Sequence, residues 1–337
     1  MDYREDAEKT KDFKQSYLDG LEKLILSRQQ ELSQKRKEYC KNIFSEQAVY
    51  REEFKKMLGW PLVDCCIKGI PSMRVEKLSE EIEYTIYRMH FELFDNLEMT
   101  GLFFERKGEG KKPLVLVQHG GLGTPELISG IYGSTCNYND MLERVVSRGV
   151  HVFAPQLLLW SQKKYGVPYD RRDLDARLKR VGSSIAAVEV YGLMRVLDYF
   201  ETKDNVSDFG MVGLSYGGFY TLYLAAIDTR IKSAISCAFF NTRDQYPWSD
   251  WTWFNSAGTF DDAEIACLVY PRKLCLEIGT KDELFDATHG IKSYERLTEM
   301  CKDVGTDWLS FVLFEGTHEF CKDDIPIQML VEELTNL

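Results

Sequence analysis

The sequence predicts an α/β fold built around a mostly parallel, doubly wound sheet. From about residue 110 onward, short apolar runs alternate with helix-length segments, and the predicted parallel strands are 114–117, 150–154, 209–214, 231–240, 274–278 and 308–314. This alternation is typical of right-handed crossovers with helices on both faces of the sheet. A second observation is that a strand, a glycine-flanked serine and a helical pattern follow one another around Ser215. On such sheets, ligands bind beyond the carboxyl ends of the strands.

Residues 1–78 are predicted to form a helical extension outside the sheet. From about residue 6 to residue 58 the chain is highly charged, and its apolar residues have the spacing of amphipathic helices: Leu18, Leu21, Leu24, Ile25, Phe44, Tyr50, Phe54, Met57 and Leu58. The sequence Gly59-Trp60-Pro61 ends this pattern. We expect the extension to cover the core or to mediate self-association.

The catalytic domain is predicted to span residues 79–337 and to begin with antiparallel strands. Apolar and polar residues alternate over 82–89 and again over 99–104, with turn residues near Asp95 and Asn96. Two alternating runs joined in this way predict an antiparallel pair at a sheet edge.

Residues 241–270 form a long, aromatic insertion between two predicted parallel strands. Three of the six tryptophans, Trp248, Trp251 and Trp253, fall within six residues of it. Long connections of this kind often form a lid or a pocket wall over an active site. The alternative interpretation, aromatic packing of a crossover helix, has equal weight, and the two are compatible.

Composition limits the class of protein. The 337 residues, 44% of them hydrophobic, can bury one large core with appendages or two smaller units. The net charge of −11 disfavours nucleic acid and anionic membranes as partners. We find no apolar run of membrane-spanning length and no signal-peptide pattern at the charged N-terminus, so we expect a cytoplasmic protein. The nine cysteines include no C-x-x-C pair, which predicts reduced thiols without a zinc site, and Cys237 and Cys275 lie in predicted core strands.

The sequence Gly213-Leu214-Ser215-Tyr216-Gly217 has the pattern of a nucleophile elbow. The turn is so tight that the residues two before and two after the serine must lack side chains, and both are glycine. A serine placed in this way usually attacks carbonyl carbon. Ser215 is therefore the predicted nucleophile.

A serine nucleophile needs a base and an acid that orients the base. His318 lies just past the last predicted strand, and Asp282 lies in the loop after the strand before it. The chain order of serine, aspartate and histidine is that of an α/β-hydrolase triad. The alternatives for the acid are Glu277, Glu283 and Asp286, and the more weakly placed histidines, which we expect to be structural, are His90, His151 and His289.

The negative charge of an acyl-transfer transition state requires preorganised N–H donors. One predicted donor is the backbone N–H of Tyr216, directly after the nucleophile. The other comes from the loop His119-Gly120-Gly121-Leu122-Gly123, where we favour Gly121, with Leu122 as the neighbouring alternative. His119 itself is expected to anchor the loop.

The segment 170–180 is dense in charges of both signs. One interpretation is a solvated segment with salt bridges. The alternative is that an arginine reaches the pocket and orients a polar or anionic group of the substrate; the candidates are Arg171, Arg172, Arg177 and Arg180.

From about residue 80 onward, the chain resembles the α/β-hydrolase superfamily. The resemblance lies in Gln118-His119-Gly120-Gly121, in the elbow ending Gly217-Gly218, in Gly279-Thr280-Lys281-Asp282 and in Gly316-Thr317-His318. Within the superfamily, the chain is similar to the dienelactone-hydrolase-like and acetyl-xylan-esterase-like branch, through residues 51–59 and 173–178. The resemblance implies Ser215, Asp282 and His318 as the triad and Gly121 with Tyr216 as oxyanion donors. Dienelactone hydrolases proper use a cysteine where this chain has Ser215.

These features predict a serine carboxylesterase that cleaves small or medium esters, acetylated sugars among them, without a metal or an organic cofactor. The Ser-Tyr-Gly-Gly sequence also resembles prolyl-oligopeptidase-like peptidases, so a peptidase or acylaminoacyl hydrolase is an alternative. A catalytically silent binding protein on the same fold is another. The expected partner is a small-molecule ester, and the sequence leaves a homo-oligomer open.

Overall fold

The computed structural model describes residues 6–59, 69–94, 96–160 and 166–335. Its centre is a nine-stranded sheet in the order β1-β2-β3-β5-β4-β6-β7-β8-β9. The strands are β1 Met73–Glu80, β2 Tyr84–Phe94, β3 Leu97–Arg106, β4 Lys112–Gln118, β5 His151–Pro155, β6 Val206–Leu214, β7 Ile231–Cys237, β8 Lys273–Gly279 and β9 Leu309–Phe314.

Strands β4 to β9 confirm the predicted parallel sheet. The pairs β4–β5, β4–β6, β6–β7, β7–β8 and β8–β9 are all parallel. Strand β7 ends at Cys237, three residues earlier than predicted. Ala238, the next residue, has φ 52°, so the chain leaves the extended conformation there.

The antiparallel edge is confirmed and is one strand wider than predicted. Strands β2 and β3 pair antiparallel, and β1 adds a further antiparallel strand outside β2. Most side chains of β1 are exposed, so the strand has little of the apolar alternation from which strands are predicted. Asp95, half of the predicted turn, lies outside the described residues, and Asn96 has φ 65°.

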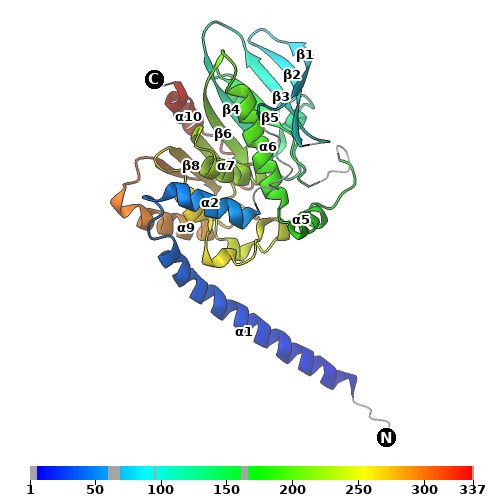
Figure 1. Cartoon of the computed structure of the whole chain (residues 1–337), viewed down its shortest axis with the longest axis vertical. Coiled ribbons are helices and arrows are strands. Elements are labelled where there is room, and N and C mark those ends of the chain that lie inside the picture. Colours follow the sequence, from blue (N-terminus) through cyan, green and yellow to red (C-terminus); the bar gives the residue numbers. More distant parts are fainter. Residues whose placement is uncertain (1–5, 60–68, 95, 161–165, 336–337) are drawn as a thin grey trace.

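The helices cover both faces of the sheet (Figure 1). They are α1 Ala7–Tyr39, α2 Gln47–Leu58, α3 Pro125–Ile128, α4 Met141–Val146, α5 Arg171–Arg180, α6 Ile185–Phe200, α7 Tyr216–Ile227, α8 Asp262–Cys267, α9 Ala287–Met300 and α10 Ile325–Thr335. Helices α2, α6, α7 and α8 share one apolar core with one sheet face, and α3, α4 and α10 share a second core with the other face.

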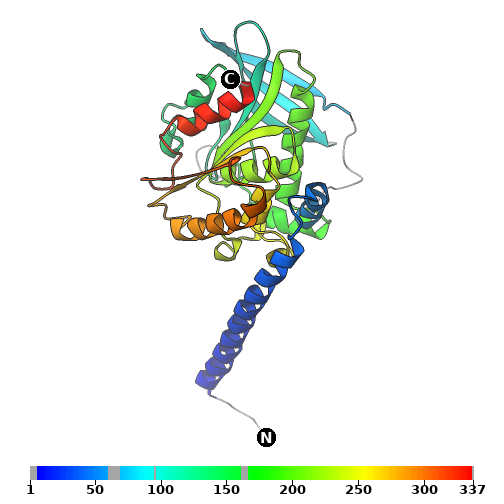
Figure 2. The ribbon, with the colours of Figure 1, turned by 90° about the vertical axis from the view of Figure 1, so that its left-hand side faces the viewer.

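The N-terminal extension consists of two helices with different positions. Helix α2 lies on the body, and its Phe54 and Leu58 are fully buried. Helix α1 contacts the body only near its C-terminal end and otherwise projects away from it (Figures 1 and 2). Strand β1 crosses the predicted domain boundary at residue 78. Two of the residues predicted to end the helical pattern, Trp60 and Pro61, lie outside the described residues.

Candidate functional site

Ser215 lies in the turn between strand β6 and helix α7, at the carboxyl edge of the sheet. Its backbone has φ 62° and ψ −121°, a strained combination that persists mainly at functional sites. Only glycine fits on either side, because a Cβ on Gly213 would lie 2.4 Å from the carbonyl of Gly217. A Cβ on Gly217 would in turn lie 2.2 Å from the oxygen of Gln118. This is the geometry of a nucleophile elbow.

The glycine-rich loop after β4 lies against this turn. A Cβ on Gly120 would lie 3.1 Å from the Cβ of Ser215, and the Gly120 N–H donates to the Tyr138 hydroxyl at 2.8 Å. Among the hydrogen bonds of the described residues, none uses the backbone N–H of Gly121 or of Tyr216. Backbone donors without an internal acceptor, next to a serine, are suited to bind an oxyanion.

His119 anchors the same loop, as predicted. Its buried Nε2 accepts the Leu157 N–H at 3.2 Å, and its Nδ1–H donates to the Gly120 carbonyl at 2.9 Å. Since a backbone N–H can only donate, Nε2 must be unprotonated and the proton must be on Nδ1. Burial lowers the pKa of His119 to about 4, so the ring is neutral near pH 7.

His318 and Asp282 form a hydrogen-bonded pair. The Nδ1 of His318 lies 2.9 Å from Oδ2 of Asp282, whose carboxylate is fully buried. The other oxygen, Oδ1, accepts the N–H groups of Leu284 at 2.8 Å and Phe285 at 2.9 Å. The Phe285 ring also stacks on the imidazole at 5.6 Å between centroids. The carboxylate therefore fixes the ring's orientation and its tautomer.

The alternative acids do not bond to His318. Glu277 is buried inside β8, where neither carboxylate oxygen has a hydrogen-bond partner among the described residues, and burial raises its pKa to about 7. Asp286 caps helix α9, and Glu283 is exposed. His151 accepts the Arg106 N–H at 3.1 Å from within β5, which is a structural role.

Short contacts connect the loop of His318 to that of Ser215. The Ser215 N–H donates to the Cys237 carbonyl at 2.9 Å, and the Cys237 thiol lies 3.5 Å from the carbonyl oxygen of Glu319, next to the histidine. Among the described residues, the structure contains no hydrogen bond from Ser215 Oγ to the imidazole. In active sites without a ligand, hydrogen bonds of this kind are often long and tighten when substrate binds.

Arg171 lies in a buried polar network behind the elbow. It donates to Asp250 at 2.8 Å and to Glu189 at 3.0 Å, and its guanidinium carbon lies 5.3 Å from the centre of the Tyr216 ring. The Tyr216 hydroxyl donates to the same Asp250 at 2.7 Å, and Tyr220 donates to Glu189. Of the four candidate arginines of segment 170–180, Arg171 therefore packs against Tyr216, the residue after the predicted nucleophile. Neither Asp250 nor Glu189 belongs to a motif that sequence reasoning could have used.

The three predicted pocket tryptophans have different environments. Trp251 is buried against Tyr216, with ring centroids 4.6 Å apart, and it fills the core. Trp253 is also buried and packs on Tyr223, further along α7 from Ser215. Trp248 is half-buried, so it is the one of the three best placed to contact a ligand.

Trp160 was not predicted, and it joins Trp248 next to the elbow. The two indole rings are 5.3 Å apart, and Trp160 also packs on Tyr216 at 5.5 Å. A Cβ on Gly121 would lie 3.1 Å from the Trp160 ring. Arg172 lies 5.6 Å from the Trp248 ring. A lone tryptophan after a strand carries no sequence signal for this position.

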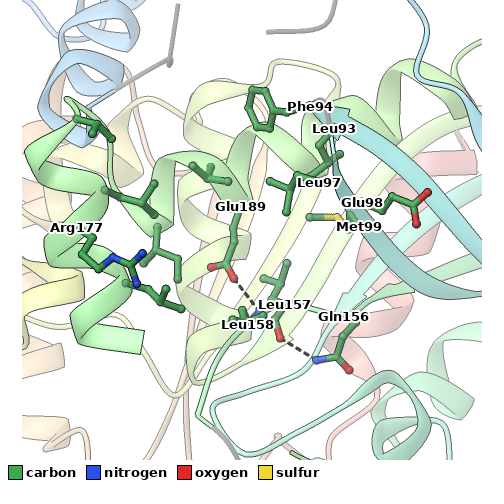
Figure 3. A pocket seen from close by; sticks show the side chains of 15 residues that line it. Leu93, Phe94, Leu97, Glu98, Met99, Gln156, Leu157, Leu158, Arg177 and Glu189 are labelled. Carbon is green, nitrogen blue, oxygen red and sulfur yellow. Dashed lines mark hydrogen bonds between the residues drawn. The ribbon is translucent and has the colours of Figure 1, made fainter. Parts of the chain in front are cut away.

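A cavity of about 560 Å³ lies between α5, α6, the β2–β3 hairpin and the segment after β5 (Figure 3). Its walls are mostly apolar, with Arg177 and Glu189 among the polar residues. On this wall, Glu189 accepts the Leu158 N–H at 2.8 Å. No triad candidate is among the described residues that line it, and Glu189 connects the cavity to the Arg171 network.

Within the ranges that the structure describes, no group of three or more His, Cys, Asp or Glu side chains is arranged to hold a metal ion. No helix in the described part of the chain has both the length and the apolar character of a bilayer span.

The chain is similar in sequence to one named hydrolase and in fold to several esterases. No protein-family model matches the chain. The "Putative hydrolase YtaP" of Bacillus subtilis (strain 168) is 27% identical, covering 73% of this chain and 84% of that protein.

Solved structures of esterases are similar in fold. The "putative acetyl xylan esterase" of Bacteroides fragilis has a TM-score of 0.67 at 17% identity, covering 80% of this chain and 75% of the other. Acetyl xylan esterase 1 from Thermoanaerobacterium sp. has a TM-score of 0.60 at 16% identity, with 89% and 98% covered. The glucuronoyl esterase from Solibacter usitatus has a TM-score of 0.58 at 15% identity, with 83% and 90% covered. The fold predicted from the sequence is confirmed.

Proposed function

We propose that this chain, which has the α/β-hydrolase fold, is a serine carboxylesterase that acts through an acyl-enzyme on Ser215. The observation that carries the proposal is the Asp282–His318 hydrogen bond of 2.9 Å at the sheet edge that also bears the strained Ser215 turn. An oriented imidazole beside a serine on an elbow is the arrangement that activates a hydroxyl.

The reaction would proceed in two halves. Ser215 Oγ attacks the ester carbonyl while Nε2 of His318 takes its proton, and the carbonyl oxygen becomes an anion that the N–H groups of Gly121 and Tyr216 stabilise. Collapse of this intermediate breaks the ester bond, and the imidazolium gives the proton to the leaving alcohol. A water molecule then attacks the acyl group, gives its proton to His318, and the acid leaves as Ser215 regains its proton.

We further propose esters of carbohydrates as the substrate class. The names of the similar structures, two of them acetyl xylan esterases, support this class. Trp160 and half-buried Trp248, beside Gly121, offer aromatic surface on which a sugar ring packs well. A small-molecule ester is then the partner, rather than nucleic acid or a membrane. A cytoplasmic location agrees with the free thiols of all seven described cysteines.

A fluorophosphonate probe with a reporter group tests the proposal. The native protein should be labelled at Ser215, and Ser215→Ala should not be labelled. Equal labelling of the two proteins, or none of the native one, would refute it. A parallel substrate panel separates the ester and amide hypotheses: turnover of acetylated xylosides and p-nitrophenyl acetate but not of aminoacyl anilides is expected.

A further inference from the structure

Arg171 is a buried arginine whose guanidinium binds partners from four other segments of the chain. Only 3% of the residue is exposed. Its Nε donates to Asp250 at 2.8 Å, and its Nη2 donates to the Tyr220 hydroxyl at 2.6 Å. Its Nη1 donates both to Glu189 at 3.0 Å and to the backbone carbonyl of Leu158 at 2.6 Å. A planar fork of five N–H donors can make all these bonds at once, whereas the single ammonium group of a lysine cannot.

One side of this network holds Tyr216, whose backbone N–H is one of the proposed oxyanion donors. The carboxylate oxygen of Asp250 that accepts the Nε–H of Arg171 also accepts the Tyr216 hydroxyl, at 2.7 Å. The Tyr216 ring packs on Trp251, and its centre lies 5.3 Å from the guanidinium carbon. Tyr216 is also the first residue of helix α7. Because the side chain is held at both its ring and its hydroxyl, the backbone N–H beside Ser215 has a fixed position.

The other side of the network holds the loop that bears Gly121, the second proposed donor. The Leu158 carbonyl that binds the guanidinium lies in the segment after β5. Two residues later, the Trp160 N–H donates to the Gly121 carbonyl at 2.8 Å. The Leu157 N–H donates to the ring of His119, earlier in the same loop, at 3.2 Å. The segment therefore binds the loop at two points, one on each side of the Gly121 N–H along the chain.

We propose that Arg171 is a positioning residue that fixes the two oxyanion donors relative to each other; this role rests on the proposed function, in which the N–H groups of Gly121 and Tyr216 bind the anion. An oxyanion is well bound only where both donors lie about 2.7–3.1 Å from its oxygen. The two donors belong to turns that follow different strands, β4 and β6. The guanidinium is the group to which both sides of the network are hydrogen-bonded.

Arg171 acts without touching the substrate, because its side chain is buried behind the elbow. Its loss should therefore affect neutral and anionic esters alike, and it should change kcat rather than KM. A displacement of about 1 Å in an active site can lower the rate by about a hundredfold. An arginine with a structural role alone would instead lower the amount of folded protein, while each folded molecule would keep the native kcat.

Arg171→Lys and Arg230→Lys form a matched pair of variants. Arg230 also binds carboxylates, among them Asp228 at 2.6 Å and Asp198 at 2.8 Å. It lies directly before β7, at the opposite edge of the sheet from Ser215. Both variants keep the positive charge, and both should melt at a lower temperature than the native protein. With active sites counted by complete fluorophosphonate labelling, kcat for p-nitrophenyl acetate should fall about 10-fold to 100-fold in Arg171→Lys and stay native in Arg230→Lys.

Inhibition by an aryl trifluoromethyl ketone reports on the oxyanion donors directly. Ser215 Oγ adds to the carbonyl carbon of the ketone, His318 takes the hydroxyl proton, and the carbonyl oxygen becomes an anion that faces the two donors. The inhibition constant should rise in Arg171→Lys by about the factor by which kcat/KM falls, and it should stay native in Arg230→Lys. Tyr216→Phe removes one bond between the network and α7 and leaves the arginine in place. It should show the same proportion, with a fall in kcat of about tenfold.

An Arg171→Lys enzyme with kcat and inhibition constant within about threefold of native would overturn the positioning role. A fall in kcat without a rise in the inhibition constant, or an equal fall in Arg230→Lys, would overturn it too. If Arg171→Lys does not fold, a Tyr216→Phe enzyme with native constants would overturn it. These results would leave the proposed function standing, because the native protein would still be labelled at Ser215 and turn over esters. A native protein that does neither would overturn both.

Discussion

Replacing Asp282 by asparagine should nearly abolish turnover because the new side chain would force the wrong tautomer on His318. Oδ1 of Asp282 accepts two backbone N–H groups, from Leu284 and Phe285, and Oδ2 faces the imidazole Nδ1. The asparagine must keep its carbonyl oxygen on the two N–H donors, so its NH₂ group faces Nδ1. Nδ1 then becomes an acceptor, and the proton moves to Nε2, the nitrogen that must receive the proton of Ser215.

The size of the effect follows from those contacts. Turning the amide over would leave two N–H donors without acceptors, a buried one on Phe285 and a part-buried one on Leu284, at about 1–3 kcal/mol each. The productive tautomer is therefore disfavoured by about 2–6 kcal/mol, or roughly 30-fold to 10⁴-fold. The lost carboxylate also no longer stabilises the imidazolium, so we expect kcat to fall by about 10³-fold to 10⁴-fold.

Steady-state hydrolysis of p-nitrophenyl acetate measures this effect, with KM and kcat determined separately. The fall should be in kcat, since the substitution leaves the binding surface intact. Glu283→Gln, on the exposed neighbouring carboxylate, is the matched control and should keep native rates. An Asp282→Asn enzyme within about tenfold of native kcat would refute the assignment of the acid.

Three further substitutions test the surrounding structure. Glu277→Gln should raise the free energy of unfolding at pH 8 by on the order of 3 kcal/mol and leave it unchanged at pH 4. The pKa of Glu277 is about 7 in the folded protein and 4.5 ordinarily, so the native protein loses stability as pH rises from 4.5 through 7, and glutamine does not titrate. Equal urea midpoints of the two proteins at pH 8 would contradict this. The native protein should lose about 3 kcal/mol of unfolding free energy as pH falls from 6.5 to 4, because the buried His119 ring resists protonation in the folded state. His119→Asn should remove this loss, and parallel stability–pH curves of the two proteins would count against it. Arg171→Met should cost about 3–5 kcal/mol in urea unfolding by leaving two buried carboxylates without their cation, whereas the exposed Arg180→Met should be nearly neutral, and similar costs for both would show that the network is not stabilising.

The sequence predicted what depends on local pattern. Strands β4 to β8 are apolar runs with most of their side chains buried. Gly213 and Gly217 are required by contacts within the elbow itself and with the adjacent loop after β4. The order of the parallel strands then brings the loops of Asp282 and His318 together, and the geometry selects Asp282 over Glu277 and Asp286.

What escaped prediction depends on contacts between distant segments. Arg171 is buried in an ion pair with Asp250, which lies 79 residues later in the chain. Trp160 reaches the elbow only through the path of the chain after β5. Strand β1 pairs by its backbone while its side chains remain exposed, so no alternation marks it. Trp251 and Trp253 lie in an aromatic insertion of the kind that often forms a lid, but both are buried in the core.

Trapping of the acyl adduct tests the central claim most directly. An acid quench during turnover of p-nitrophenyl acetate, followed by peptide mass spectrometry, should find one acetyl group, on the peptide that contains Ser215, and none in Ser215→Ala. An actively turning-over enzyme with no adduct at Ser215, or with the adduct on another residue, would contradict the account.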